Sequence, residues 1–212
     1  MMIKRLDLIL QFIMMKKLKD NMKEYIVDKY DKIEVIGDIH GEISALIYSV
    51  KNNVGIKKTD DDFTNSIIII AGDCGLGFPS LKKDNKDLLK LKKKKKNINS
   101  IVFFIRGNHD DPDYFDGKTV DMSNLKAIPD YSIIRLKGTN VLCVGGAISI
   151  DRKWREKEEL RSYSKRTLYW PEEGLMYDEE KLKEIKEKGI KVDIIITHTA
   201  PKCFYGSFNN EN

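Results

Sequence analysis

Short apolar runs separated by polar clusters predict a set of buried strands. Four runs, at residues 33–36, 67–71, 101–105 and 194–197, are rich in isoleucine and other β-branched residues. They are too short for helices, and their continuous apolar character is typical of strands buried on both faces. Each run ends in a polar cluster, so we expect the chain to turn where each strand stops.

Apolar residues at helical spacing predict two helices. Residues 42–52 follow the first run and carry one apolar stripe, and residues 178–188 carry another that ends at Gly189. The first stripe consists of Ile43, Leu46, Ile47 and Val50. The order strand, helix, strand indicates that the first two strands are parallel neighbours.

A tighter connection joins two further predicted strands, at residues 131–136 and 140–144. The intervening Lys137-Gly138-Thr139 has the composition of a turn, which indicates a hairpin rather than a crossover. Together these elements predict an α/β fold in which a mixed β-sandwich is flanked by helices.

Composition adds the expected size and partners. The 212 residues, 41% of them hydrophobic, are enough for the core of one domain. Much of the net charge of +5 comes from a lysine-rich stretch at 81–98, which we interpret as a solvated helix and loop. Because no aromatic or arginine residue is interleaved with these lysines, nucleic acid is an allowed partner but not a favoured one.

The chain ends and the cysteines bear on its location. Residues 6–15 are apolar, but polar residues interrupt them, no cleavage site follows, and the stretch is too short to span a bilayer. We interpret residues 1–29 as an extension with an amphipathic helix, with Met22 as an alternative start, followed by one domain over 30–212. Three scattered cysteines without a CxxC spacing argue against a disulfide framework, so we expect a cytoplasmic protein without a membrane role.

Three of the predicted strands are each followed by a glycine and then by Asp, His or Asn. These residues are Asp38, His40, Asp73, Asn108, His109 and Asp110. Because parallel strands of an open α/β sheet present their sites at the carboxyl ends, we expect these side chains to meet there. Carboxylate oxygens and imidazole nitrogens suit Mn, Fe or Zn, and one shared carboxylate can hold two ions about 4 Å apart.

The ordered motifs resemble the calcineurin-like metallophosphoesterase superfamily, whose signature runs D-x-H, GD, GNH(D/E) and a later histidine at a strand end. The matching motifs are GDIHG at 37–41, GDCG at 72–75, GNHD at 107–110 and THTAP at 197–201. GGAISIDR at 145–152 and WPEE at 170–173 are similar to a bacterial and phage-type branch. The resemblance implies a four-layer α/β/β/α arrangement and metal-dependent hydrolysis of phosphomonoesters or phosphodiesters.

The resemblance also implies a metal site. Asp38 and His40 bind one divalent ion, Asp73 bridges two, and Asn108 and His198 bind the second, the ions being Mn, Fe or Zn. A hydroxide that both ions activate is the implied nucleophile. The implied substrate is a phosphoprotein, a nucleotide or a small phosphoester.

Three further residues receive catalytic roles from the same resemblance. His109 protonates the leaving alcohol or stabilises the transferring phosphoryl group, and Asp110 orients its imidazole. Arg106, directly before the GNHD motif, is placed to grip a phosphate oxygen. Trp154 and Trp170, with Arg152 and Arg155, are candidates to line the substrate cleft, although for the two tryptophans we favour packing under a long loop.

The pattern departs from the superfamily after His198. Members normally supply two more histidines from a GHxH turn, whereas no histidine follows His198 here. The resemblance therefore implies a domain that is incomplete at its C-terminus, and we expect weaker metal binding than in a version extended through that turn. Alternatives to an active enzyme are a catalytically weak or inactive relic, or a nuclease that uses the lysine-rich stretch.

Overall fold

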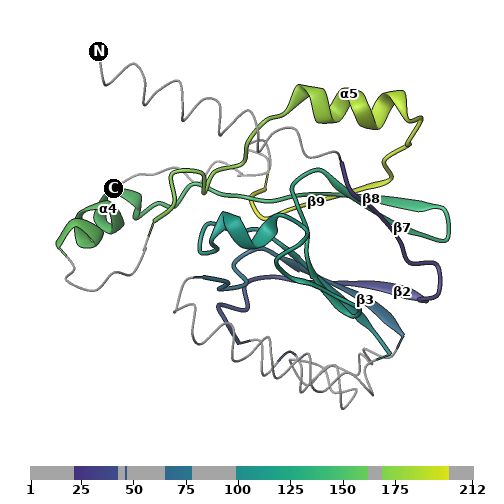
Figure 1. The fold of residues 1–212 in the computed structure, drawn as a ribbon, viewed down its shortest axis with the longest axis horizontal. Helices are drawn as coiled ribbons and strands as arrows, with labels where there is room; N and C mark the ends of the chain where they lie inside the picture. The colour runs from purple at the N-terminus through teal and green to yellow at the C-terminus, as the bar shows by residue number, and fades with distance from the viewer. Residues whose placement is uncertain (1–21, 43–45, 47–64, 78–98, 162–168, 201–212) are drawn as a thin grey trace, which may run out of the picture.

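Two β-sheets stack face to face in the computed structural model of the chain (Figure 1). The structure describes residues 22–42, 46, 65–77, 99–161 and 169–200. Of the predicted helix at 42–52, the structure describes only Glu42 and Leu46. The lysine-rich stretch at 81–98 lies outside the described residues.

The first sheet contains three of the four strands predicted from apolar runs. Its order is β2-β3-β4-β6-β5, with bounds β2 Lys32–Ile36, β3 Ser66–Ala71, β4 Ile101–Ile105, β6 Leu125–Ala127 and β5 Asp121–Met122. The strands β2, β3, β4 and β6 are parallel, and only β5 is antiparallel to its neighbour. The prediction that β2 and β3 are parallel neighbours is therefore confirmed, and β4 continues the parallel order.

The second sheet contains the predicted hairpin. Its order is β1-β7-β8-β9, with bounds β1 Glu24–Ile26, β7 Ser132–Leu136, β8 Thr139–Val144 and β9 Ile194–Thr197. Strands β7 and β8 are antiparallel, and the turn between them places Lys137 at φ 48° and Gly138 at φ 87°. Two successive positive φ angles belong to the turn type whose twist suits a two-residue hairpin.

Strand β1 was not predicted from the sequence. It pairs in parallel with β7, and Val27 just after it is buried in the core between the sheets. Residues 24–26 of the predicted extension 1–29 therefore belong to the second sheet, whereas residues 1–21 lie outside the described part of the chain.

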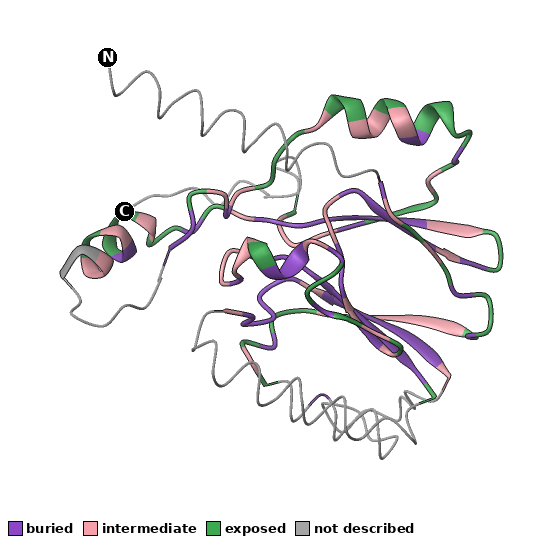
Figure 2. Cartoon of the chain, in the orientation of Figure 1, coloured by how far each residue is buried: buried purple, intermediate pink, exposed green. Residues whose placement is uncertain are grey.

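Alternate residues of β3 and β4 pack into two different layers, so both faces of these strands are buried (Figure 2). Ile67, Ile69 and Phe103 face the second sheet, where Ile134 and Val141 meet them. The intervening residues Ile68, Ile70, Val102 and Phe104 pack on the outer face with Leu46 and Tyr114. This two-sided burial explains why these strands appear in the sequence as continuous apolar runs.

Helix α5, Glu179–Glu187, covers the outer face of the second sheet (Figure 1). Its N-cap Asp178 accepts a hydrogen bond from the backbone N–H of Lys181, and Ile185 packs against Ile133 and Leu142. The chain leaves the helix through Gly189 at φ 65°, as the sequence predicted. An α/β sandwich with a helix on its outer face is thus confirmed.

Two helical segments were not predicted. They are α4, Arg152–Arg161, and the short 3-10 helix η2, Pro112–Phe115. Helix α4 has the sequence RKWREKEELR, which contains too few apolar residues to form a stripe. It projects to the side of the two sheets in Figure 1.

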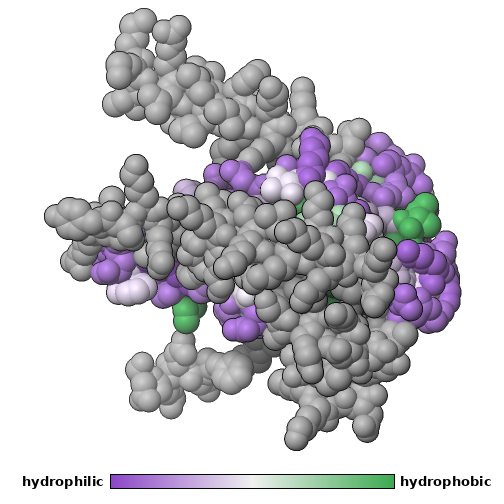
Figure 3. Space-filling view, turned by 60° about the horizontal axis from the view of Figure 1, so that its bottom comes forward, coloured by the Kyte–Doolittle hydropathy of each residue, from purple (hydrophilic) through white to green (hydrophobic). Residues whose placement is uncertain are grey.

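The described surface is mostly polar on the face shown in Figure 3. Within the described residues, no helix combines the length and the apolar character needed to cross a membrane. Cys74 and Cys143 are buried free thiols, and Cys203 lies outside the described part of the chain.

Phe103 tests the packing between the sheets. It is fully buried and meets the ring of Tyr25 edge-on, with 5.2 Å between the ring centroids. We expect Phe103→Ala to lower stability by about 3–5 kcal/mol, a fall in Tm on the order of 10 °C. Ile26→Ala on the edge strand, where Ile26 is 70% exposed, is the control and should change stability by about 0.5 kcal/mol or less. Equal effects in a thermal melt would contradict this packing.

Candidate metal centre

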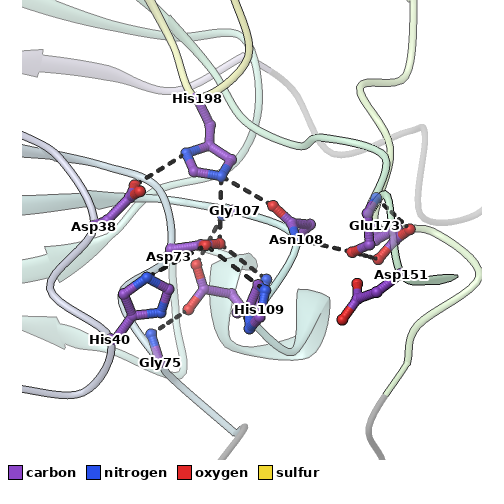
Figure 4. A network of polar contacts seen from close by, with 12 residues as sticks. Asp38, His40, Asp73, Gly75, Gly107, Asn108, His109, Asp151, Glu173 and His198 are labelled. Carbon is purple, nitrogen blue, oxygen red and sulfur yellow. Dashed lines mark hydrogen bonds and ion pairs between the residues drawn. The ribbon is translucent and has the colours of Figure 1, made fainter. Parts of the chain in front are cut away.

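The candidate ligands meet at the carboxyl ends of the parallel strands (Figure 4). Asp38 and His40 follow β2, Asp73 follows β3, and Asn108 and His109 follow β4. His198 comes from the end of β9 in the other sheet, so both sheets contribute to the site. The structure thus brings Asp38, His40, Asp73, His109 and His198 together, with Asn108 beside His198.

Two groups of three side chains have ligand atoms within 4.8 Å of one another. One group is His40, Asp73 and His109, and the other is Asp38, Asp73 and His198. Asp73 is common to both, as the resemblance implied for a bridging carboxylate. The division of the other residues differs from the implied one, because Asp38 lies with His198 and His109 lies with His40.

The Asp73 carboxylate is buried, with only 7% of its side chain exposed. Its Oδ1 accepts a hydrogen bond of 3.0 Å from the backbone N–H of His109 and lies 3.3 Å from Nε2 of His198. Burial raises the pKa of Asp73, but the hydrogen bonds from His198 and from the His109 backbone outweigh it and lower the pKa to about 2. Asp73 is therefore an anion at every physiological pH.

The two nitrogens of His198 have different surroundings. Nδ1 lies 2.8 Å from the backbone oxygen of Ala71, and Nε2 lies 3.0 Å from Oδ1 of Asn108. Burial lowers the pKa of His198, but the contacts with Asp73 and Ala71 and the charge of Asp38 raise it overall. A cation bound through Nε2 has to displace the proton that these contacts favour.

The ring of His109 lies between His40 and helix α4. The two imidazoles meet edge-on with centroids 5.4 Å apart, and Nε2 of His109 contacts the guanidinium of Arg155. Burial lowers the pKa of His109, and the positive charge of Arg155 lowers it further. A guanidinium has only N–H donors, so its contact with Nε2 favours the neutral form of the imidazole, in line with the lowered pKa. Proton donation by His109 stays a prediction.

Glycines in the motifs allow the ligand loops to touch. Gly72 has φ +94°, and a Cβ there would lie 2.2 Å from Nδ1 of His198. A Cβ at Gly107 would lie 2.1 Å from the backbone nitrogen of Asp73. His40 and Asp73 themselves have φ angles of 42° and 48°, a left-handed conformation that costs non-glycine residues about 1 kcal/mol or more. Such strain is typical of functional sites.

The structure corrects the role expected of Asp110. Its Oδ1 accepts from the backbone N–H groups of Gly75 and Leu76, and its Oδ2 accepts from those of Cys74 and Gly107, at 2.7 to 3.1 Å. Burial raises its pKa to about 6 although these four bonds favour the anion. Both oxygens are thus taken up by the backbone, and Asp110 joins the loops after β3 and β4 instead of orienting the His109 ring.

Arg106 also differs from the expectation, because its guanidinium does not face the ligand cluster. Nη1 donates to the carbonyl oxygens of Glu172 and Glu173, and Nη2 donates to that of Gly174 and forms an ion pair with Asp130 at 2.9 Å. A buried guanidinium needs such a full set of acceptors. Arg106 therefore holds the segment 172–174, and the expected grip on a phosphate oxygen stays a prediction.

Three residues beside the cluster had no predicted role as metal ligands: Ser149, Glu173 and Arg155. Of these, only Arg155 had been considered, as a possible part of the lining of the substrate cleft. Ser149 and Glu173 lie in the GGAISIDR and WPEE motifs, which the sequence had marked only as signs of a branch. Their place in these two motifs was the sequence signal that could have pointed to Ser149 and Glu173. Of the tryptophans, Trp170 is buried as favoured, but Trp154 is 60% exposed and does not pack under a loop.

The two-sheet α/β fold and the carboxylate and histidine cluster at its strand ends define a candidate metal-binding enzyme. The family model of calcineurin-like phosphoesterases matches residues 32–212, so the chain belongs to this family. Membership indicates a hydrolase that acts on phosphoesters. Comparison with curated proteins and with solved structures gave no match.

Gly72 tests the close approach of the loops. We expect Gly72→Ala to weaken Mn²⁺ binding, because the new Cβ displaces the His198 ring. Gly138→Ala is a matched control: its φ of +87° is similar, but no atom lies within 4 Å of the new Cβ. Both variants should lose about 1–2 kcal/mol from backbone strain, and only Gly72→Ala should lose Mn²⁺ affinity in calorimetry. Equal affinities would contradict the close approach.

Asp110 tests the link between the loops. In Asp110→Asn the amide NH₂ faces backbone N–H groups, which leaves donors without acceptors at a cost of about 1–3 kcal/mol each. We expect Tm to fall by several degrees in a chain of this size. The exposed Asp121→Asn should leave Tm within the error of the melt. An unchanged Tm for Asp110→Asn would show that the four hydrogen bonds do not hold the loops.

Proposed function

We propose that this chain hydrolyses phosphomonoesters or phosphodiesters with two divalent cations held at the cluster around Asp73. The observation that carries the proposal is the buried Asp73 carboxylate, which belongs to both groups of candidate ligands. A single anion within reach of two sets of donors can hold two cations close together, as a two-metal site does.

The residues present fit such cations in their chemistry. Asp73, Asn108 and His198 form one donor set, in which Oδ1 of Asn108 and Nε2 of His198 are 3.0 Å apart. The resemblance assigns Asp73, Asp38 and His40 to the other cation, whereas the distances group Asp38 with His198 and His40 with His109. The side chains of Asp38 and His40 are the more exposed, at 58% and 55%. Carboxylate, carboxamide and imidazole donors suit Mn, Fe or Zn. When bound, such cations polarise phosphoryl oxygens and lower the pKa of water.

Arg155 takes the part that the sequence had given to Arg106. Its guanidinium contacts His109, whose Nε2 lies 4.0 Å from Oδ2 of Asp73, and Asp151 one helical turn earlier holds its Nε at 3.0 Å. Arginine is suited to phosphate oxygens because its planar fork donates two parallel hydrogen bonds. We assign Arg155, together with His109, to the charge that develops on the transferring phosphoryl group.

The proposed substrate is a phosphoprotein, a nucleotide or a small phosphoester. The loop after β3 reads Gly72-Asp73-Cys74-Gly75 and lacks the arginine of the GDxxDRG motif expected in eukaryotic-type protein phosphatases. A nuclease is the less favoured alternative, because no aromatic or arginine residue is interleaved with the lysines of the stretch at 81–98. The cytoplasmic location stays a prediction.

Hydrolysis assays test the proposal. The metal-stripped chain should release p-nitrophenol from p-nitrophenyl phosphate or its bis-ester only after Mn²⁺, Fe²⁺ or Zn²⁺ is added. We expect Asp73→Asn to lower kcat/KM by more than about 100-fold, because losing a direct ligand should exceed the 10- to 100-fold loss typical of its supporting residues. The control Asp121→Asn removes an exposed carboxylate and should retain activity.

Two results would contradict the proposal. Activity that survives complete removal of divalent ions would exclude the metal-dependent chemistry. No activity with any of the three ions, in a chain that still melts cooperatively, would favour the inactive relic. His109→Ala separates chemistry from binding, since it should lower kcat while Mn²⁺ binding at Asp73, Asn108 and His198 persists.

A further inference from the structure

A chain of hydrogen bonds runs from Asn108 into the protein interior (Figure 4). Nδ2 of Asn108 donates to Oγ of Ser149 at 2.8 Å, and Oγ of Ser149 donates to Oε2 of Glu173 at 2.7 Å. The backbone N–H of Ser149 donates to the other oxygen of Glu173, Oε1, at 2.9 Å. Asn108, Ser149 and Glu173 are called the amide relay below.

The direction of each bond in the amide relay follows from chemistry. An ionised carboxylate can only accept, so the hydroxyl of Ser149 has to give its proton to Glu173. The oxygen of Ser149 is then left with lone pairs, and it has to accept from Asn108. This fixes which end of the Asn108 carboxamide faces Ser149, a choice that the nearly equal shapes of its O and NH₂ leave open.

The opposite end of the carboxamide faces the metal cluster. Oδ1 of Asn108 lies 3.0 Å from Nε2 of His198, which itself lies 3.3 Å from Oδ1 of Asp73. A cation requires a lone pair from each of these groups, and the NH₂ end of an amide has none to give. A flipped Asn108 would therefore point two N–H donors at a site for a cation.

The base of the amide relay is held in place by Arg106. Glu173 is fully buried, and its backbone oxygen accepts from Nη1 of Arg106 and from the backbone N–H of Ala147. The neighbouring carbonyls of Glu172 and Gly174 accept from the same guanidinium. A buried carboxylate in a fixed backbone segment is a rigid acceptor, which is what sets the direction of the hydroxyl above it.

We propose that Glu173 and Ser149 are positioning residues that orient the Asn108 carboxamide, so that its oxygen and not its NH₂ group faces one of the two cations. This inference rests on the proposed function of Asn108 as a ligand. It gives the GGAISIDR and WPEE motifs a common task, since each contributes one member of the amide relay.

Glu173→Gln replaces one acceptor oxygen by a donor NH₂ group and keeps the size of the side chain, so it changes the direction of the hydrogen bonds in the amide relay. The glutamine NH₂ faces one of the two Ser149 donors, and because the backbone N–H cannot turn, the hydroxyl has to reverse. Its proton then points at Asn108, which favours the flipped amide. We expect calorimetry with Mn²⁺ to show a loss of about 10- to 100-fold in affinity for one cation, with the other little changed.

Two matched variants separate positioning from general support. Glu172→Gln makes the same substitution one residue earlier, outside the amide relay, and should bind Mn²⁺ like the original chain. In an Asn108→Asp background both ends of the side chain carry oxygen, so the added Glu173→Gln should cost no further affinity. An equal loss in both backgrounds, or no difference between Glu173→Gln and Glu172→Gln, would overturn the proposal.

The NMR signal of the Asn108 side-chain NH₂ group in the metal-free protein tests the amide relay independently of the proposed function. In the metal-free protein, the Asn108 side-chain NH₂ signal, assigned by its loss in Asn108→Asp, should shift and exchange faster with solvent in Ser149→Ala and Glu173→Gln. An unchanged signal in both variants would overturn the amide relay. Failure of the original chain to bind Mn²⁺ would count against the proposed function instead, and the NH₂ signal would still decide whether the relay holds Asn108.

Discussion

The buried carboxylate of Asp110 is the contact on which the metal cluster depends. It accepts four backbone hydrogen bonds, three from residues 74–76 after β3 and one from Gly107 after β4. Asp73 precedes the first loop segment and Asn108 follows Gly107, so this contact fixes the distance between them. Burying an anion is costly unless it is fully hydrogen-bonded, and the bent backbone of the two loops supplies the donors.

A second buried charge organises the other side of the cluster. Arg106 leaves the end of β4, pairs with Asp130 and holds the three carbonyls of 172–174. Glu173 in that segment accepts a hydrogen bond from Ser149, and Ser149 accepts one from Asn108, so Arg106 supports the orientation of Asn108. The two charged residues thus have different roles. Asp110 fixes the positions of the loops after β3 and β4, and Arg106 supports the segment 172–174, which orients the Asn108 carboxamide. Neither has to touch substrate to be essential, because the orientation of metal ligands depends on the residues behind them.

Membership of the calcineurin-like phosphoesterase family and the geometry of the site point in the same direction. The ligands occupy the carboxyl ends of parallel strands, where loops are free to vary without disturbing the sheet. His198 is the exception, since it comes from the opposite sheet and is brought in by Gly72, which has no side chain to keep it out. Left-handed backbone at His40 and Asp73 is maintained by the same packing, so part of the stability of the sandwich is used to hold the ligands in place.

The sequence by itself determined the strands β2, β3, β4, β7, β8 and β9, helix α5 and the position of the candidate ligands, because continuous apolar runs, turn residues and motif order are local signals. It missed β1, β5, β6, η2 and α4, which are short or lack a periodic apolar face. It did not predict the partners of Arg106 and Asp110, although both were recognised as part of the site. Which way a side chain points, and which partners saturate it, depends on segments distant in the chain: residues 172–174 for Arg106 and 74–76 for Asp110. Only the tertiary structure decided those partners, because a buried charge takes its role from the donors and acceptors that the fold brings around it.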